Sequence, residues 1–154
     1  MRKIAIAALL IAAVPMAPVA ARKAPAAHSE TERNRAVVAA FIDLFYKQHK
    51  VREAFETYVV PGYIQHNPIA ADGRDTAVNA LEPYFASQPN LKHDVKRIIV
   101  DGNLAAVHVR ATNGPDDRGF AIVDILRLEN GKIVEHWDVA QPVPEKSANA
   151  HPMF

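Results

Sequence analysis

The Asn-Gly pair at residues 130–131 constrains the fold most strongly, because it separates two long apolar runs. Asn and Gly both tolerate the positive φ angles of a two-residue hairpin turn, so the pair predicts two tightly joined antiparallel strands. A second turn is predicted at residues 101–103, Asp-Gly-Asn, between two further apolar runs. The C-terminal half is therefore predicted to be a meander of four long strands, at 95–100, 104–112, 120–128 and 133–139.

The first half of the chain follows a helical period instead. Apolar residues recur at helical spacing from about residue 30 to 48. A shorter helix is predicted to end before Pro61-Gly62, and a third helix to start after Asp72-Gly73, with Pro83 kinking or breaking it. Helices followed by a strand meander predict an α+β domain, in which about three helices pack on one face of a curved, mostly antiparallel sheet.

The N-terminal 21 residues have the pattern of a secretory signal peptide. A basic start precedes an apolar stretch from Ile4 to Val14, and small residues follow up to Ala21. Because this stretch is shorter than the about 20 residues of a membrane span, we expect cleavage after Ala21, or as late as Ala27, rather than an uncleaved anchor. The protein would then be periplasmic or secreted and free of the membrane, with a flexible leader at 22–29 and one domain at 30–154.

Composition excludes several classes of function. The 154 residues carry a net charge of +1 with no run of six like charges, which argues against a nucleic-acid partner. The chain has no cysteine, which rules out thiol nucleophiles, thiolate metal sites and disulfides. It also lacks a phosphate loop, a dinucleotide fingerprint, a Gly-x-Ser-x-Gly elbow and closely spaced histidine pairs, so we predict neither a cofactor nor a metal.

Asp124 is the most unusual residue of the predicted strands. It lies in the middle of an apolar segment, where both β-propensity and burial disfavour an aspartate. Regular pairing about the turn places it opposite Trp137 and on the same face as Glu135, among Phe and Ile side chains. Such surroundings suit a general base or a protonated hydrogen-bond donor. The alternatives are a structural, hydrogen-bonded aspartate, or a one-residue slip that exchanges the two faces.

Two histidines are further candidates for chemistry. His108 alternates with valines in a predicted strand, where a lone histidine is more often packed than catalytic. His66 and Asn67 precede Pro68 in an extended segment, which we interpret as a small strand or the edge of a pocket. The alternative for Asn67 is turn formation by its side chain.

The segment from Gln141 to Phe154 is rich in proline and polar residues but closes with Met153-Phe154. Such an apolar end either folds back over a pocket or a neighbouring subunit, or frays. A curved open sheet also leaves one face and its edges to be covered, so we expect a homodimer.

Three segments of the chain resemble those of SnoaL-like proteins. They are Tyr63–Pro68, Val123–Arg127 and Gly131–Val139, the last followed by Gln141-Pro142. SnoaL-like proteins belong to the nuclear transport factor 2-like superfamily and include polyketide cyclases and predicted aldol-condensation-catalysing enzymes. The resemblance covers about residues 30 to 154. It implies a cone-shaped barrel of three helices wrapped by a curved sheet, with a pocket at the wide end and acid–base chemistry without a metal or cofactor.

Carried over to this sequence, the resemblance implies Asp124 or Asp138 as the general base, with His66 or His108 polarising a substrate carbonyl. The residues expected to bind substrate are Asn67, Tyr63, Trp137, Asp138 and His136. The expected function is an aldol condensation, cyclisation or isomerisation of a small apolar carbonyl compound. The alternative is an exported protein that binds a small hydrophobic ligand without chemistry.

Overall fold

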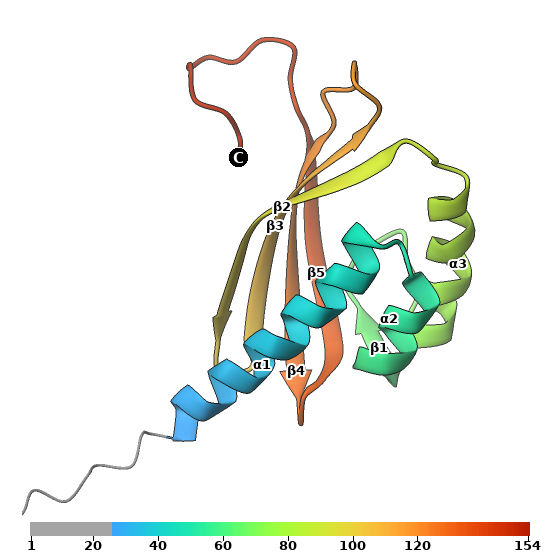
Figure 1. Ribbon diagram of the computed structural model, residues 1–154, viewed down its shortest axis with the longest axis vertical. Helices are drawn as coiled ribbons and strands as arrows, with labels where there is room; N and C mark the ends of the chain where they lie inside the picture. The colour runs from blue at the N-terminus through green and yellow to red at the C-terminus, as the bar shows by residue number, and fades with distance from the viewer. Residues whose placement is uncertain (1–25) are drawn as a thin grey trace, which may run out of the picture.

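The computed structural model describes residues 26–154, which form three helices and a five-stranded sheet (Figure 1). The expected signal peptide and its cleavage site at Ala21 lie outside the described residues. No helix within the described part is long and apolar enough to cross a membrane. The elements are α1 (Ala26–Ile42), the π-helical turn η1 (Asp43–Lys47), α2 (Val51–Tyr58), β1 (Val59–Gln65), α3 (Arg74–Ala86), β2 (Leu91–Asp101), β3 (Leu104–Asn113), β4 (Phe120–Glu129) and β5 (Lys132–Pro142).

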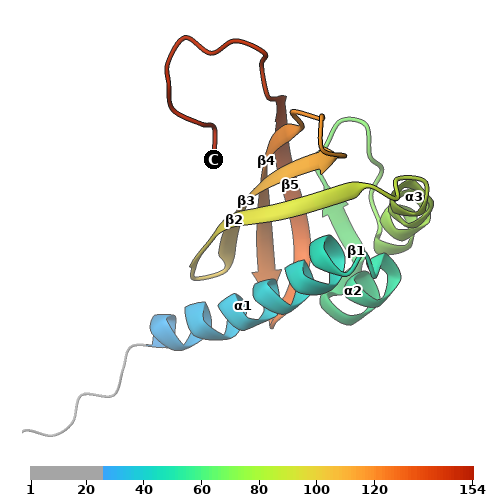
Figure 2. The ribbon, with the colours of Figure 1, turned by 45° about the horizontal axis from the view of Figure 1, so that its top comes forward.

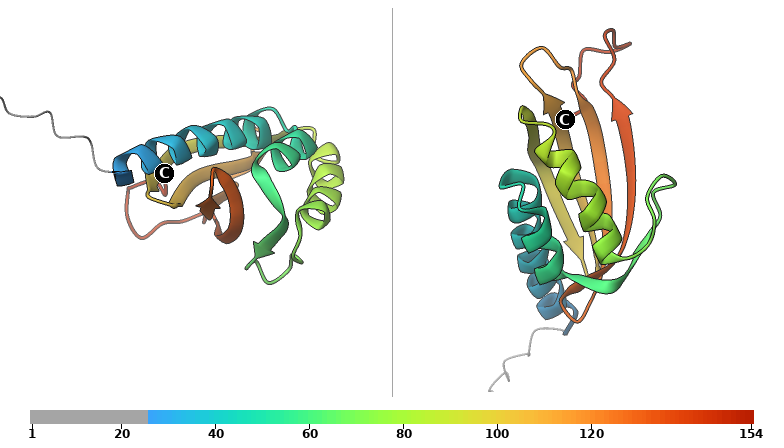
Figure 3. Two further views of the ribbon diagram at one scale, coloured as in Figure 1. Left: turned by 90° about the horizontal axis from the view of Figure 1, so that it is seen from below. Right: turned by 90° about the vertical axis from the view of Figure 1, so that its right-hand side faces the viewer.

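The sheet has the strand order β1-β5-β4-β3-β2. Strands β2 to β5 pair antiparallel, and β1 adds to the edge of β5 in parallel. The sheet curves around the helices without closing into a barrel, and α1 lies along its concave side (Figures 2 and 3). The predicted α+β architecture, with helices on one face of a mostly antiparallel sheet, is confirmed.

The four predicted strands and both predicted turns are confirmed within a few residues. Asn130 and Gly131 have φ angles of 49° and 73°, the positive values that a tight hairpin turn requires. The predicted break at Pro83 is wrong, because α3 continues to Ala86. In the last helical turn a proline removes a single backbone donor, and the Ser87 N–H still donates to the Pro83 carbonyl at 3.0 Å.

The pairing of β4 with β5 departs from a regular hairpin by one residue. The register shifts just after the turn, where Val134 is an extra residue on β5 and forms a β-bulge. Asp138, rather than Trp137, therefore lies opposite Asp124. The prediction that Asp124 shares a face with Glu135 and Trp137 is wrong, because a shift of one residue exchanges the faces of all later side chains.

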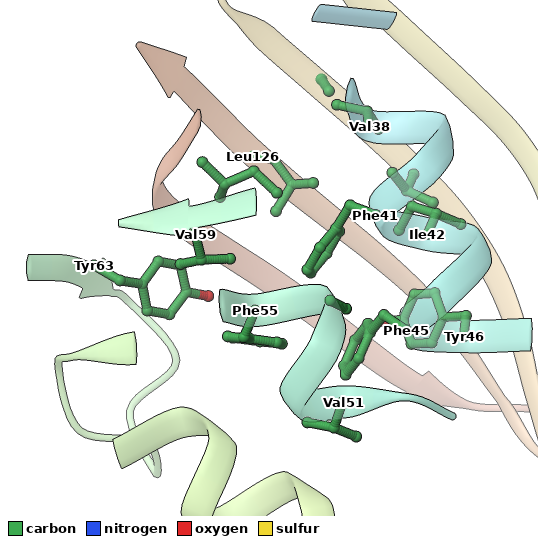
Figure 4. Close-up of a cluster of buried hydrophobic side chains, with 14 of the residues drawn as sticks. Val38, Phe41, Ile42, Phe45, Tyr46, Val51, Phe55, Val59, Tyr63 and Leu126 are labelled. Atoms are coloured by element: carbon green, nitrogen blue, oxygen red, sulfur yellow. The ribbon is translucent and has the colours of Figure 1, made fainter. Parts of the chain in front are cut away.

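The hydrophobic core lies between the helices and the concave face of the sheet. Phe45 of η1 is its centre: its ring lies 5.4 Å from Phe41, 5.4 Å from Phe55 and 5.2 Å from Phe85. Figure 4 shows Phe41 of α1, Phe45 of η1 and Phe55 of α2 gathered on one side of these helices. Burying one such side chain stabilises a fold by about 1.5–3 kcal/mol, so this core stabilises the domain without disulfides. Other buried members are Val38, Ile42, Val51, Val59, Val78, Val107, Leu126, Leu128 and Ile133.

The convex face of the sheet carries a row of directly opposed residues that crosses four strands. They are Ile99, Ala106, Ile125 and Trp137. Ile99 is 62% exposed and Ile125 is 37% exposed. Within residues 26–154 no helix covers this face (Figure 3). An exposed apolar row of this kind marks a surface suited to a protein partner.

The segment after β5 returns to this convex face. The Phe154 ring stacks on His108 with ring centroids 5.7 Å apart. Lys96 Nζ and Arg110 Cζ lie 5.8 Å and 5.4 Å from the same ring. The segment therefore folds back over the sheet rather than over the space between sheet and helices.

Candidate active site

A cavity of about 330 Å³ lies between the helices and the concave face of the sheet. Small-molecule sites commonly measure roughly 300–1,000 Å³, so this one suits a compact ligand. Most of its walls are apolar, including Phe41, Phe45, Phe55, Leu81, Ile122 and Leu126. Its polar lining residues are Tyr46, Tyr63, Gln65, Asn67, Asp124, His136 and Asp138. All but one of these come from β1, β4, β5 or the residues just after β1; Tyr46 comes from η1.

Both carboxylate oxygens of Asp124 have a partner. The Tyr46 hydroxyl donates to Oδ2 at 2.8 Å, and His136 Nε2 lies 3.1 Å from Oδ1. The Asp124 side chain is buried, at 6% relative exposure, which these two contacts offset. Asp124 is therefore a buried, hydrogen-bonded aspartate, which is one of the alternatives that the sequence left open for it.

The hydrogen bonds around His136 determine where its protons lie. Gln65 Oε1 accepts from the Asn67 backbone N–H at 2.9 Å, so this atom is the amide oxygen. His136 Nδ1, 2.9 Å from the same oxygen, must therefore carry a hydrogen and donate it. Its other nitrogen, Nε2, lies 3.1 Å from Asp124 Oδ1, so the ring bridges Gln65 and Asp124 with the hydrogen of Nδ1 on the Gln65 side.

Asp138 lies directly opposite Asp124 across β4 and β5 and also lines the cavity. A single group, Asn67 Nδ2, donates to both of its oxygens, at 2.8 Å and 3.0 Å. A carboxylate offers about four lone-pair sites; one donor group faces those of Asp138, whereas two groups face those of Asp124, so Asp138 keeps the larger acceptor capacity. Of the two carboxylates, Asp138 is thus the one with more room to contact a bound molecule.

The two tyrosines of the cavity also differ in the hydrogen bonds that their hydroxyl groups already make. Burial raises the pKa of Tyr46 and of Tyr63 well above the usual value, and the Asp124 carboxylate raises both further. Both phenols are therefore protonated donors at ordinary pH. The Tyr46 hydroxyl is committed to Asp124, whereas the Tyr63 hydroxyl accepts weakly from Gln65 Nε2 at 3.4 Å. The Tyr63 ring points toward the aromatic side chains of α1 and α2 (Figure 4) and lines the cavity.

The expectation that His66 polarises a group in the pocket does not fit its position. His66 Nε2 lies 2.7 Å from Glu135 Oε1, and its ring stacks on Trp137 at 4.6 Å, outside the cavity lining. The hydrogen bond from His66, followed by that from Arg127, lowers the pKa of Glu135. His66 and Trp137 thus hold the end of β1 against β5 on the side away from the cavity.

His108 is also on the side away from the cavity. In β3 it pairs with Val123, while its neighbour Val107 pairs with Asp124 on the concave face. Arg97 Nη1 donates to His108 Nδ1 at 2.7 Å. The expectation that His108 faces the same pocket as Asp124 is therefore wrong, because alternate residues of a strand point to opposite faces.

Of the residues expected to take part, the structure brings together Asp124, Asp138, His136, Asn67 and Tyr63, and it separates His66, His108 and Trp137 from them. Sequence reasoning missed Tyr46 and Gln65. Tyr46 continues the apolar stripe of α1, which indicates core, and the π-helical turn that directs it to the cavity has no sequence signature. Gln65 lies within the Tyr63–Pro68 segment, but nothing in its sequence pattern distinguished it from the neighbouring residues. Among the described residues, no three His, Asp or Glu side chains are grouped as metal ligands would be.

A curved α+β domain with an apolar cavity and two carboxylates at its polar end has the form of a small-molecule site. The chain belongs to the SnoaL-like family: the family model described as SnoaL-like domain matches residues 38–136. A comparison with curated proteins gives no match.

Solved structures support the same fold. An NTF2-like protein of unknown function from Mesorhizobium loti is 21% identical, with a TM-score of 0.62, over 73% of this chain and 93% of that one. A candidate ketosteroid isomerase from Kribbella flavida is 22% identical, with a TM-score of 0.64, over 78% and 86%. A candidate SnoaL-like polyketide cyclase from Jannaschia is 20% identical, with a TM-score of 0.58, over 72% and 87%.

Proposed function

We propose that this protein is an enzyme that moves a proton next to the carbonyl group of a small apolar compound, without a cofactor. Aldol condensation, cyclisation and isomerisation all use this step. One observation carries the proposal: Asp138 keeps free acceptor capacity at the polar end of an otherwise apolar cavity. The likeness in fold to the candidate polyketide cyclase and ketosteroid isomerase supports it.

The residues have distinct tasks in this proposal. Asp138 takes the proton from the carbon next to the carbonyl, and the electrons of the broken C–H bond move onto the carbonyl oxygen. Tyr63 donates a hydrogen bond to that oxygen as its negative charge develops. The resulting enolate either regains the proton from Asp138 at another carbon of a conjugated system, or attacks a second carbonyl carbon, whose oxygen then takes the proton back from Asp138. Asn67 fixes the position of Asp138 through the hydrogen bonds that its side-chain amide donates. Tyr46 and His136 both contact Asp124, and these contacts fix the polar wall of the cavity next to Asp138.

The experiment follows hydrogen exchange next to the carbonyl in a panel of cyclic and aryl ketones of about 8 to 16 heavy atoms, by proton NMR in D₂O. That size range corresponds to the cavity volume. Exchange above the buffer rate for at least one ketone supports the proposal. Ketones that raise the unfolding temperature, and so occupy the cavity, yet never exchange would contradict it.

The mostly apolar lining favours a second function, the binding of a small hydrophobic ligand without chemistry. Under this function the ligand stabilises the protein, and replacing Asp138 with Asn leaves that stabilisation unchanged. Both functions predict that a ligand raises the unfolding temperature. Only the enzymatic function predicts hydrogen exchange next to the carbonyl above the buffer rate.

We also infer that two copies associate through the convex face of the sheet. The apolar row of Ile99, Ala106, Ile125 and Trp137 supports this, because isologous dimers commonly bury such a surface. We expect light scattering after gel filtration to give the mass of a dimer, and Ile125→Glu to give that of a monomer. A monomeric wild-type protein at 0.1 mM would contradict the inference.

We further propose that the protein is exported to the periplasm or secreted, on the strength of its N-terminal sequence pattern. Expression of the full chain in a Gram-negative host is expected to yield a mature protein that begins at Arg22. Intact-mass spectrometry of the periplasmic fraction measures this directly. A chain that keeps residues 1–21 in the cytoplasmic fraction would refute the proposal.

A further inference from the structure

His93 of β2 lies behind the polar wall of the cavity, against Tyr46. The two rings overlap with centroids 4.4 Å apart and an interplanar angle of 31°. Phe85 of α3 also stacks with His93, at 5.3 Å between ring centroids, and His49 lies edge-on at 5.5 Å. His93 therefore occupies a packed aromatic site that is separate from the cavity lining.

The neutral form of His93 is the one that fits this site. Its Nδ1 is buried and has no hydrogen-bond partner among the described residues. Burial, followed by the nearby charge of His49, lowers the pKa of His93 to about 4, and a hydrogen bond with the main chain of Tyr46 opposes this shift. A protonated ring would place a second donor where no acceptor lies.

The groups packed around His93 come from four elements. Tyr46 comes from η1, His49 from the turn after η1, Phe85 from α3, and Ala111 is its pairing partner on β3. The titratable groups against the ring are thus Tyr46 and His49. His49 has a φ of 55°, so its place beside His93 depends on a backbone conformation that few side chains adopt.

We propose that His93 is a positioning residue for Tyr46: the neutral ring holds the tyrosine where its hydroxyl donates to Asp124, and protonation of His93 in acid releases that donor. Tyr46 is the link because its ring contacts His93 while its hydroxyl lies 2.8 Å from Asp124 Oδ2. The contact between His93 and Tyr46 belongs to the fold and does not depend on the proposed function. Its effect on turnover rests on the proposed function, in which Asp124 and its partner His136 form the wall of the cavity behind Asp138.

The test follows Tyr46 itself, by NMR of the full chain labelled with ¹³C at the tyrosine ring carbon that bears oxygen. Tyr46→Phe assigns the signal among the four tyrosines. Between pH 7 and pH 3 we expect the Tyr46 signal to shift with a midpoint near pH 4. In His93→Phe, which keeps an aromatic contact but does not titrate, this midpoint is expected to vanish. His151→Phe, a matched change in an exposed segment, is expected to keep it.

A second variant tests whether the same midpoint depends on His49, the charged neighbour of His93. His49→Asn keeps a residue tolerant of positive φ and removes the neighbouring charge, so the midpoint is expected to move to higher pH. An unchanged midpoint in either His93→Phe or His49→Asn overturns the proposal. Neither readout needs turnover, so both stand even if no ketone is a substrate.

The pH dependence of folding stability gives a further test of whether His93 is neutral in the folded protein. The pKa of His93 in the folded protein, about 4, lies below the ordinary value of 6.5, so the unfolded chain binds more protons between these values. The stability that the neutral ring contributes is present above pH 6.5 and is lost as the pH falls toward 4. We expect the unfolding temperature to fall across this window less steeply in His93→Phe than in the wild type; equal slopes would count against a neutral, buried His93.

Discussion

Asp138→Asn is expected to lower kcat/KM for exchange of the proton next to a ketone carbonyl by about 10²–10⁴-fold. An amide of almost the same size keeps the place of the carboxylate opposite Asp124, but it has no basic oxygen to accept the proton. Binding of the ketone, measured by the rise in unfolding temperature, is expected to change little. The effect therefore lies in the chemical step rather than in affinity.

Two variants serve as controls for this result. Asp101→Asn makes the same chemical change at an exposed position at the end of β2 and is expected to leave the rate unchanged. Asp124→Asn is expected to lower the rate only about tenfold, because Asp124 contacts His136 and Tyr46 rather than serving as the free acceptor. A larger loss in Asp124→Asn than in Asp138→Asn would reverse the assignment of the base.

The largest effect on stability is expected for Asp124→Ala, at about 3–5 kcal/mol in the free energy of unfolding. The substitution removes the acceptor of the buried Tyr46 hydroxyl and leaves His136 Nε2 without its partner 3.1 Å away. It also leaves a small void beneath the sheet. Equilibrium unfolding in urea measures the loss, with an unchanged dependence on denaturant as evidence that the fold is retained.

Tyr46→Phe isolates one part of this network. It removes the hydroxyl that donates to Asp124 but keeps the ring against His93, so a loss of about 1 kcal/mol is expected. Asp138→Asn, whose carboxylate is less buried and has one donor group, is expected to cost less than Asp124→Ala. If all three variants unfold at the same denaturant concentration, the network has no structural role.

Several elements of the fold could be predicted from short-range patterns. The Asn130-Gly131 turn and the strands on either side of it follow from backbone preferences and alternation over a few residues. The helices before residue 90 follow from apolar spacing. Asp124 could be singled out because a carboxylate in an apolar strand must be compensated, whatever the compensating partner is.

The partners themselves depended on tertiary structure. One bulge residue, Val134, decides that Asp138 and His136 face the cavity while Trp137 faces away. A π-helical turn far away in sequence supplies Tyr46 to Asp124.

The sequence by itself determined the order of the elements, the hairpin turn and the presence of an unusual aspartate, because these follow from local conformational and burial preferences. Only the tertiary structure decided which side chains meet that aspartate. A shift of one residue in strand pairing costs little locally but exchanges the two faces of a sheet, and no local preference specifies it.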